Sequence, residues 1–205
     1  MIPNLLTDAG LFKKGWLHPN KSANVIGVYL AKNCDLKNSE KGASFGSIRA
    51  SFGQHSDRFH GTQIACCLTT DANGYFVPCR NSDCNFCRIF RESFRIDKAS
   101  AGGMFGAGIY SSSCSSKADN YSRNHHIRTT IHAVIICRVV LGRKQLLKTE
   151  DRNRKAPDNG FLSVEAVTKK NGGSVEYPES ITYWEDCVIP VGFILYERSG
   201  WDGGR

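Results

Sequence analysis

The chain has 205 residues, of which 40% are hydrophobic and 22% charged. This length suits one domain with a sizeable core, so we expect a single unit over residues 1–205. No apolar run reaches the length of a membrane-spanning helix. Lysine and arginine outnumber aspartate and glutamate by 27 to 19, a formal charge of +8. That balance favours an anionic partner, such as a nucleotide, a nucleic acid or an acidic protein surface, although a merely basic surface is the alternative.

The first third of the chain predicts little regular structure. Residues 9–33 suggest an opening helical and loop segment that is broken at Pro19, and residues 34–56 suggest polar connecting structure. The apolar residues expected to anchor these two segments are Trp16, Val25, Val28, Tyr29, Phe45, Ile48 and Phe52.

Residues 58–62, Arg-Phe-His-Gly-Thr, are typical of a strand that ends at a binding site. Gly61 permits close approach of its backbone to a ligand, and Thr62 adds a hydroxyl. A lone histidine such as His60 is more often structural, so this segment carries no conclusion by itself.

Cysteine spacing is the strongest local pattern. Four of the nine cysteines follow the spacing Cys66-x12-Cys79-x4-Cys84-x2-Cys87. Four thiolates predict a closed tetrahedral site for structural zinc, within an insert at about 66–94. Cys67 competes with Cys66 as the fourth ligand, and reduced cysteines in a loop are the alternative. Crowded cysteines and a start without secretory-signal features favour an intracellular protein, nuclear or cytoplasmic.

The following segment, residues 88–100, is rich in arginine. Its basic side chains could wall a phosphate-binding cleft. The alternative is a solvated helix face with Ile89, Phe90 and Phe94 turned inward.

A glycine-rich turn leads into residues 104–122. Ile109 and Tyr110 should begin a short extended piece, and Ser115 or Ser116 should cap a short helix that ends near Tyr121. Tyr110 and Tyr121 would then lie on opposite sides of one turn, as stacking of a flat heterocycle requires. Burial of both tyrosines in the core is the alternative.

Strands dominate the remainder of the chain. Residues 131–141 form a β-branched run, 160–164 begin another short strand, and 187–196 form the last one. Residues 179–183 alternate, so Glu179, Ile181 and Tyr183 share a face. A carboxylate beside apolar neighbours needs a partner, unless it lies at an edge in water.

Taken in order, the motifs at 59–62, 106–110, 116–121 and 179–183 resemble the catalytic domain of the poly(ADP-ribose) polymerase family, the diphtheria-toxin-like ADP-ribosyltransferases with a His-Tyr-Glu triad. The cysteine array resembles a compact zinc-bearing branch. The resemblance implies an α+β ADP-ribosyltransferase fold: two packed, mainly antiparallel β-sheets, few short helices and a small zinc-binding insert.

The resemblance also implies roles for residues. His60 would bind the adenosine-side ribose of NAD, with Gly61 and Thr62 beside it, and the Gly61 backbone would hold the carboxamide. Tyr110 and Tyr121 would sandwich nicotinamide, and Glu179 would be the catalytic carboxylate, so that His60, Tyr110 and Glu179 form the triad. Ala118 stands where the family usually has a serine that bonds the carboxamide, which puts the strength of NAD binding in doubt.

We therefore expect an NAD-dependent ADP-ribosyltransferase that releases nicotinamide and adds one ADP-ribose unit to a protein or nucleic-acid acceptor. We expect a monomer without a membrane partner. Two alternatives stay open: a zinc-dependent nucleic-acid or ADP-ribose binding module with an inactive NAD site, and an NAD-dependent RNA 2′-phosphotransferase. A secreted disulfide-rich protein is a further alternative, which bound zinc would exclude.

Overall fold

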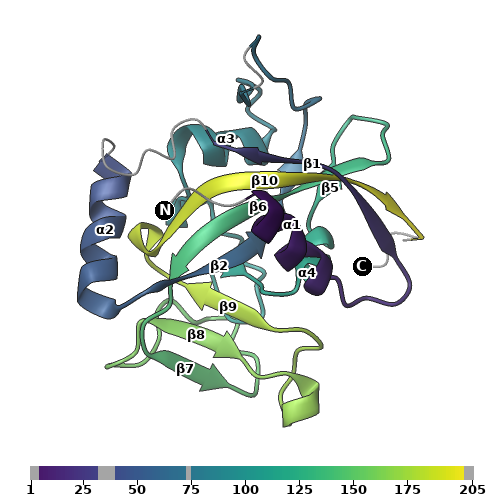
Figure 1. Cartoon of the computed structure of the whole chain (residues 1–205). Helices are drawn as coiled ribbons and strands as arrows, with labels where there is room; N and C mark the ends of the chain where they lie inside the picture. Colours follow the sequence, from purple (N-terminus) through teal and green to yellow (C-terminus); the bar gives the residue numbers. More distant parts are fainter. Residues whose placement is uncertain (1–4, 32–39, 73–74, 201–205) are drawn as a thin grey trace.

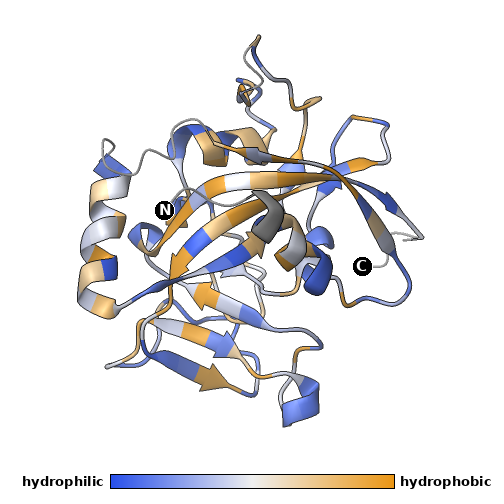
Figure 2. Cartoon of the chain, viewed as in Figure 1, coloured by the Kyte–Doolittle hydropathy of each residue, from blue (hydrophilic) through white to orange (hydrophobic). Residues whose placement is uncertain are grey.

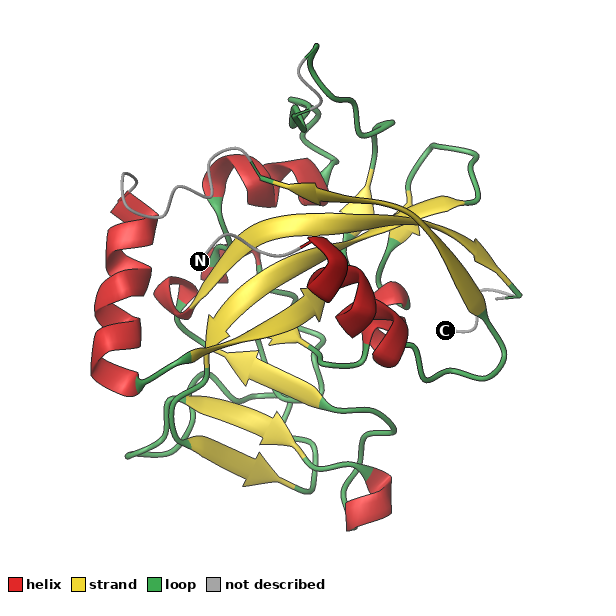
Figure 3. Cartoon of the chain, viewed as in Figure 1, coloured by secondary structure: helices red, strands yellow, loops and turns green. Residues whose placement is uncertain are grey.

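A computed structural model describes residues 5–31, 40–72 and 75–200 (Figure 1). The strands are β1 (Ser22–Leu30), β2 (His55–His60), β3 (Gln63–Ile64), β4 (Ile109–Ser111), β5 (Arg123–Asn124), β6 (Ile131–Val140), β7 (Lys144–Leu147), β8 (Ser163–Ala166), β9 (Glu179–Thr182) and β10 (Val188–Ser199). The α-helices are α1 (Leu5–Lys14), α2 (Glu40–Phe52), α3 (Asn85–Glu92) and α4 (Ser115–Asp119), and the 3-10 helices are η1 (Ile96–Lys98), η2 (Lys169–Asn171) and η3 (Glu185–Cys187). The helices are short; α1 lies over one face of the sheet that contains β6, whereas α2 stands beside that sheet (Figure 3). None of those in the described ranges is long and apolar enough to cross a membrane.

The larger sheet has the strand order β1-β10-β6-β2, and all its neighbours are antiparallel. Its central strands β6 and β10 are largely hydrophobic (Figure 2). Along β6, Ile135 and Val139 pack toward α3 and the cysteine-rich segment, whereas Val134 and Ile136 pack toward α1. Because successive side chains point to opposite faces and both faces are covered, a continuous apolar run is what this strand requires. This explains why the strand prediction for residues 131–141 was correct.

A second sheet has the strand order β4-β9-β8-β7, in which only the β7–β8 pair is parallel. The two sheets meet where Phe59 of β2 and Ser112 exchange backbone hydrogen bonds of 2.8 and 3.0 Å. This junction brings the end of β2 next to β4, which is paired with β9. The mainly antiparallel α+β architecture with few helices confirms the expected fold class.

Two expectations for the N-terminal third were wrong. Residues 22–30 form the edge strand β1 rather than helix and loop, and a register shift between Val25 and Gly27 explains the error. The shift reverses which side chains point to the core beyond it. Val25 and Val28 therefore pack on the same core at a spacing of three, while Ile26 is 50% exposed. A spacing of three imitates a helix, whereas an uninterrupted strand repeats every two residues.

Residues 40–52 form α2, although they were expected to be connecting structure. The helix contains two glycines and five serines or alanines, and Phe45 is its only large side chain that is fully buried. Lys41 binds Glu185 of η3 at 2.6 Å, so that tertiary contacts stabilise a helix of low intrinsic propensity.

Candidate active site

One cavity of about 560 Å³ opens at the junction of the two sheets. This volume is within the range of about 300–1,000 Å³ that is usual for small-molecule sites. All seven residues that the sequence nominated for cofactor binding or catalysis line it: His60, Gly61, Thr62, Tyr110, Ala118, Tyr121 and Glu179. The fold therefore collects residues from β2, β4, α4 and β9 around a single space.

His60 ends β2 and is oriented by the backbone of β4. Its Nδ1 lies 2.8 Å from the Tyr110 carbonyl oxygen. A carbonyl only accepts, so Nδ1 carries the proton and the neutral ring has Nε2 as an acceptor. Burial lowers the pKa of His60, and the hydrogen bond to Tyr110 opposes part of this shift. The ring also packs edge-on against Phe94, with centroids 5.1 Å apart. A fixed, neutral imidazole of this kind suits a ligand hydroxyl.

Tyr110 is held by the glycine-rich turn before it. Its hydroxyl accepts from the Phe105 N–H at 2.8 Å and donates to the Gly106 carbonyl at 2.9 Å. Gly106 has a φ of +79°, and a Cβ there would lie 1.8 Å from the Arg154 carbonyl oxygen, so only glycine fits. Because its hydroxyl is already bonded within the turn, Tyr110 offers the cavity an aromatic ring rather than a polar group.

Helix α4 carries the second set of cavity residues, but the serines do not cap it as expected. The helix begins at Ser115, and the N-cap Cys114 makes no side-chain capping bond. Ser115 Oγ instead donates to the Phe12 carbonyl at 2.6 Å, and Ser116 Oγ accepts from the Leu17 N–H at 2.9 Å. Both hydroxyls are used to attach α4 to the N-terminal segment.

The end of β2 passes in contact with α4. A Cβ on Gly61 would lie 1.7 Å from the Ala118 carbonyl oxygen, so the absence of a side chain at Gly61 lets the two segments meet. Ala118 is buried, and Tyr121, one turn later, is 51% exposed at the rim of the cavity. The methyl group of Ala118 leaves this wall without the hydroxyl that a serine would supply.

Glu179 starts β9 and is only 5% exposed. Burial raises its pKa, and the Lys117 ammonium, 3.3 Å from Oε1, offsets part of that rise. Lys117 Nζ also lies 5.6 Å from the centroid of the Tyr121 ring. Glu179 is the single acidic residue among the described residues that line the cavity. Sequence reasoning found Glu179 but missed Lys117, although Lys117 directly precedes Ala118 in the motif used.

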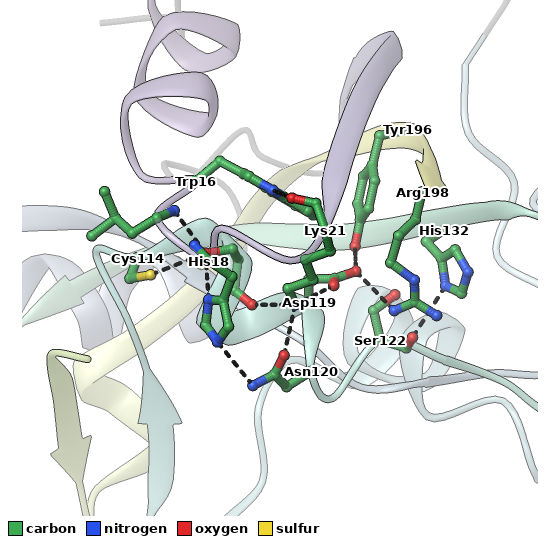
Figure 4. Close-up of polar contacts among 12 residues, drawn as sticks. Trp16, His18, Lys21, Cys114, Asp119, Asn120, Ser122, His132, Tyr196 and Arg198 are labelled. Atoms are coloured by element: carbon green, nitrogen blue, oxygen red, sulfur yellow. Dashed lines mark hydrogen bonds and ion pairs between the residues drawn. The ribbon is translucent and has the colours of Figure 1, made fainter. Parts of the chain in front are cut away.

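A buried polar network holds α4 from behind (Figure 4). Lys21 Nζ donates to Asp119 Oδ2 at 2.6 Å, to the Ser116 carbonyl at 2.7 Å and to Asn120 Oδ1 at 2.6 Å. The Lys21 and Asp119 side chains are fully buried. Asp119 Oδ1 also accepts from the Tyr196 hydroxyl and from the Arg198 guanidinium of β10. The network thus fixes the helix that carries Lys117 and Ala118 to the larger sheet.

Cys66, Cys79, Cys84 and Cys87 form a compact cluster, in which all Sγ atoms lie within 4.8 Å of one another. The Cys66–Cys87 and Cys66–Cys84 sulfur distances are 3.5 and 3.8 Å. Tetrahedral Zn–S bonds of about 2.3 Å place sulfurs about 3.8 Å apart, so the geometry is compatible with zinc. Cys67 is exposed and lies outside the cluster, which favours Cys66 as the fourth ligand.

The thiol cluster adjoins the cavity through α3. Cys84 precedes this helix and Cys87 lies within it, while Asn85 and Arg88 of the same helix line the cavity. Hydrogen bonding from Cys87 lowers the pKa of Cys84 to about 5, so the cluster favours a thiolate at that position. A metal held here would fix one wall of the cavity.

Comparison with known proteins agrees with this geometry. A family model described as the poly(ADP-ribose) polymerase catalytic domain matches residues 79–199, which is more than half of the chain. The matched segment contains Tyr110, Tyr121 and Glu179, whereas His60 precedes it. A comparison with curated proteins found no match.

Proposed function

Because this chain belongs to the poly(ADP-ribose) polymerase catalytic-domain family, we propose that it cleaves NAD, releases nicotinamide and transfers ADP-ribose to an acceptor. The observation that carries the proposal is one cavity in which two tyrosines, a half-buried histidine and one carboxylate converge from separate parts of the chain. Convergence of these side chains in one space is what a common catalytic site requires.

Each residue has a task that fits its surroundings. The Gly61 backbone can approach a carboxamide, and the rings of Tyr110 and Tyr121 are suited to stacking on nicotinamide. His60 Nε2 can accept a hydrogen bond from a ribose hydroxyl, since its Nδ1 proton is directed at a carbonyl. NAD itself supplies the bond that breaks, between nicotinamide and ribose.

Glu179 is the group that we assign to catalysis. Loss of nicotinamide builds positive charge on the ribose, and a fixed carboxylate stabilises that charge and orients an acceptor. Its burial removes competing water, and Lys117 keeps the buried carboxylate from being left without a counter-charge. The two residues therefore act as a pair: Glu179 stabilises the charge on the ribose, and Lys117 limits the rise in the pKa of Glu179.

We also propose that the four thiols bind structural zinc. Four sulfur ligands close the coordination shell, so no position remains for a reacting water. The metal would add a cross-link to the insert and would link residue 66, just beyond the cavity wall at 60–63, to α3. Its role is then to hold cavity walls rather than to take part in the chemistry.

We infer the chemical class of the acceptor from the charge of the residues that line the cavity. Besides Glu179, the charged residues that line the cavity are all basic: Arg88, Arg95, Lys98, Lys117 and Arg123. A positively charged cavity lining favours an anionic acceptor, either a nucleic acid or an acidic protein surface. Transfer of a single ADP-ribose unit remains our prediction for the product.

Ala118 supports one alternative. Without a serine hydroxyl on that wall, the cavity could bind ADP-ribose or NAD without cleaving it, as an inactive binding module. An RNA 2′-phosphotransferase would consume NAD as well, but would depend on an RNA that carries a 2′-phosphate.

The proposal is tested by incubating the protein with NAD labelled in the adenylate half. Pools of protein, DNA and RNA are added as acceptors in separate reactions. We expect nicotinamide release and label in one pool, with a mass increase of one ADP-ribose unit. Binding of NAD without cleavage would favour the inactive module. Turnover that occurs only with 2′-phosphorylated RNA, and leaves no label on the acceptor, would favour the phosphotransferase.

A further inference from the structure

One face of α3 borders the cavity. Asn85, Arg88 and Ile89 line the cavity at positions i, i+3 and i+4, which is the spacing of a single helix face. Phe86 and Cys87, on the other side of the helix, are fully buried in the core. The Arg88 side chain is therefore presented toward the cavity, where it is half-buried.

A second arginine reaches the same edge from β5. Gln63 of β3 is the parallel Cα partner of Arg123, and both residues line the cavity. Gln63 Nε2 donates to the Asp83 carbonyl at 2.9 Å, two residues before α3 begins. The β3–β5 pair is thereby fixed to the start of α3, and Arg88 and Arg123 belong to one continuous edge.

These two arginines differ from the other cations of the cavity in having no acidic partner. The others are each within 3.3 Å of a carboxylate: Lys117 with Glu179, and Arg95 and Lys98 with Asp97. Among the described residues, no ion pair or side-chain hydrogen bond is recorded for Arg88 or Arg123, and none joins either of them to Asp83. Arg88 is half-buried, and a half-buried guanidinium without a counter-charge is costly, so an anion is expected beside it. Arg123 is exposed and adds a second positive charge to this edge.

We propose that Arg88 and Arg123 together hold the pyrophosphate of the bound dinucleotide. This inference rests on the proposed function, because it assigns residues to the phosphate groups of NAD. A guanidinium fork matches phosphate oxygens with two parallel hydrogen bonds, which an ammonium cannot do. Two such forks on one edge suit a ligand with two adjacent phosphates, and they determine affinity for the ADP-ribose half rather than for nicotinamide.

The test compares ligands with and without phosphates. Dissociation constants for ADP-ribose and for nicotinamide are measured on the full chain and on Arg88→Gln and Arg123→Gln. We expect each substitution to weaken ADP-ribose binding about tenfold, because it removes charge-assisted hydrogen bonds, and to leave nicotinamide binding within about twofold of wild type. Arg80→Gln is the matched control, since Arg80 is an exposed arginine of the cysteine-rich insert that does not line the cavity.

Arg88→Lys keeps the charge without the fork, and we expect it to recover only part of the ADP-ribose affinity. Melting temperatures of all variants show whether they fold. If Arg88→Gln does not fold, Arg88→Lys still tests the assignment. Unchanged ADP-ribose affinity in folded Arg88→Gln and Arg123→Gln would overturn the pyrophosphate assignment. Equal weakening of ADP-ribose and nicotinamide would overturn it too, because it would indicate a distorted cavity. If wild-type protein binds neither NAD nor ADP-ribose, the proposed function itself fails.

Discussion

Replacing Lys21 with methionine should destabilise the folded protein by about 3–5 kcal/mol. The ammonium is buried and directs its donors at three oxygens of one short helix segment: the Ser116 carbonyl, Asp119 Oδ2 and Asn120 Oδ1. Methionine preserves most of the apolar contact of the lysine stem, so the loss is mainly polar. The substitution therefore isolates the contribution of one charge to the helix that carries the cavity residues.

The magnitude follows from the acceptors left behind. A buried acceptor without a donor costs about 1–3 kcal/mol, so three of them set a scale of about 3–9 kcal/mol. Two features favour the lower half of that range. Asp119 keeps its bonds from Tyr196 and Arg198, and Asn120 is only half-buried and can recruit water. About 3–5 kcal/mol is also the usual cost of removing one partner from a buried ion pair.

Urea unfolding at pH 7 measures this loss as a lower midpoint with an unchanged m-value. Lys148→Met is the control, because Lys148 is exposed and no ion pair is recorded for it in the described part of the chain. That variant should stay within about 0.5 kcal/mol of wild type. If Lys21→Met and Lys148→Met unfold at the same urea concentration, the Lys21 contacts contribute nothing, and α4 must be held by its serines and by the bonds of Asp119 to Tyr196 and Arg198.

Three further predictions concern the insert and the cavity. Cys84→Ser should lower both the zinc content per chain and the melting temperature, whereas Cys67→Ser should leave both unchanged; full zinc content in Cys84→Ser, measured by elemental analysis, would remove the four-thiol site. In Lys117→Met the pKa of Glu179, already raised by burial, should rise further, because an offsetting cation is lost. Activity needs the ionised carboxylate and is lost as pH falls through this pKa, so the acid limb of kcat/KM should move to higher pH; a limb that stays in place would exclude the pairing. Gly61→Ala would place a methyl group 1.7 Å from a backbone oxygen of α4, so stability should fall by about 3 kcal/mol and NAD affinity should fall with it; wild-type unfolding and affinity in this variant would contradict the close contact.

Much of the sheet structure could be predicted from local pattern. The β-branched run at 131–141 indicated a strand, and the alternation at 179–183 placed Glu179 on a face with Ile181. Cysteine spacing likewise indicated the cluster, because two ligands three residues apart define a local turn. In each case the physical cause of the pattern lies within a few residues of the chain.

Other features depend on contacts between distant segments and left no local signal. Lys21 and Asp119 are 98 residues apart, and neither residue type indicates burial until the fold brings them together. Ser116 looked like a helix cap, but its hydroxyl accepts from backbone groups near residue 17, which no spacing rule could indicate. Lys117 and Glu179 are a similar case, since their 3.3 Å contact is made only when α4 packs beside β9.

The central claim is that this cavity breaks the nicotinamide–ribose bond of NAD with Glu179. Nicotinamide release should be measured for wild-type protein and for Glu179→Gln under conditions that saturate both with NAD. The account predicts steady release by wild type, no release above background by Glu179→Gln, and similar affinity of the two proteins for ADP-ribose. Equal rates of nicotinamide release would contradict the assignment of Glu179, and no release by wild-type protein with any acceptor would contradict the enzymatic account as a whole.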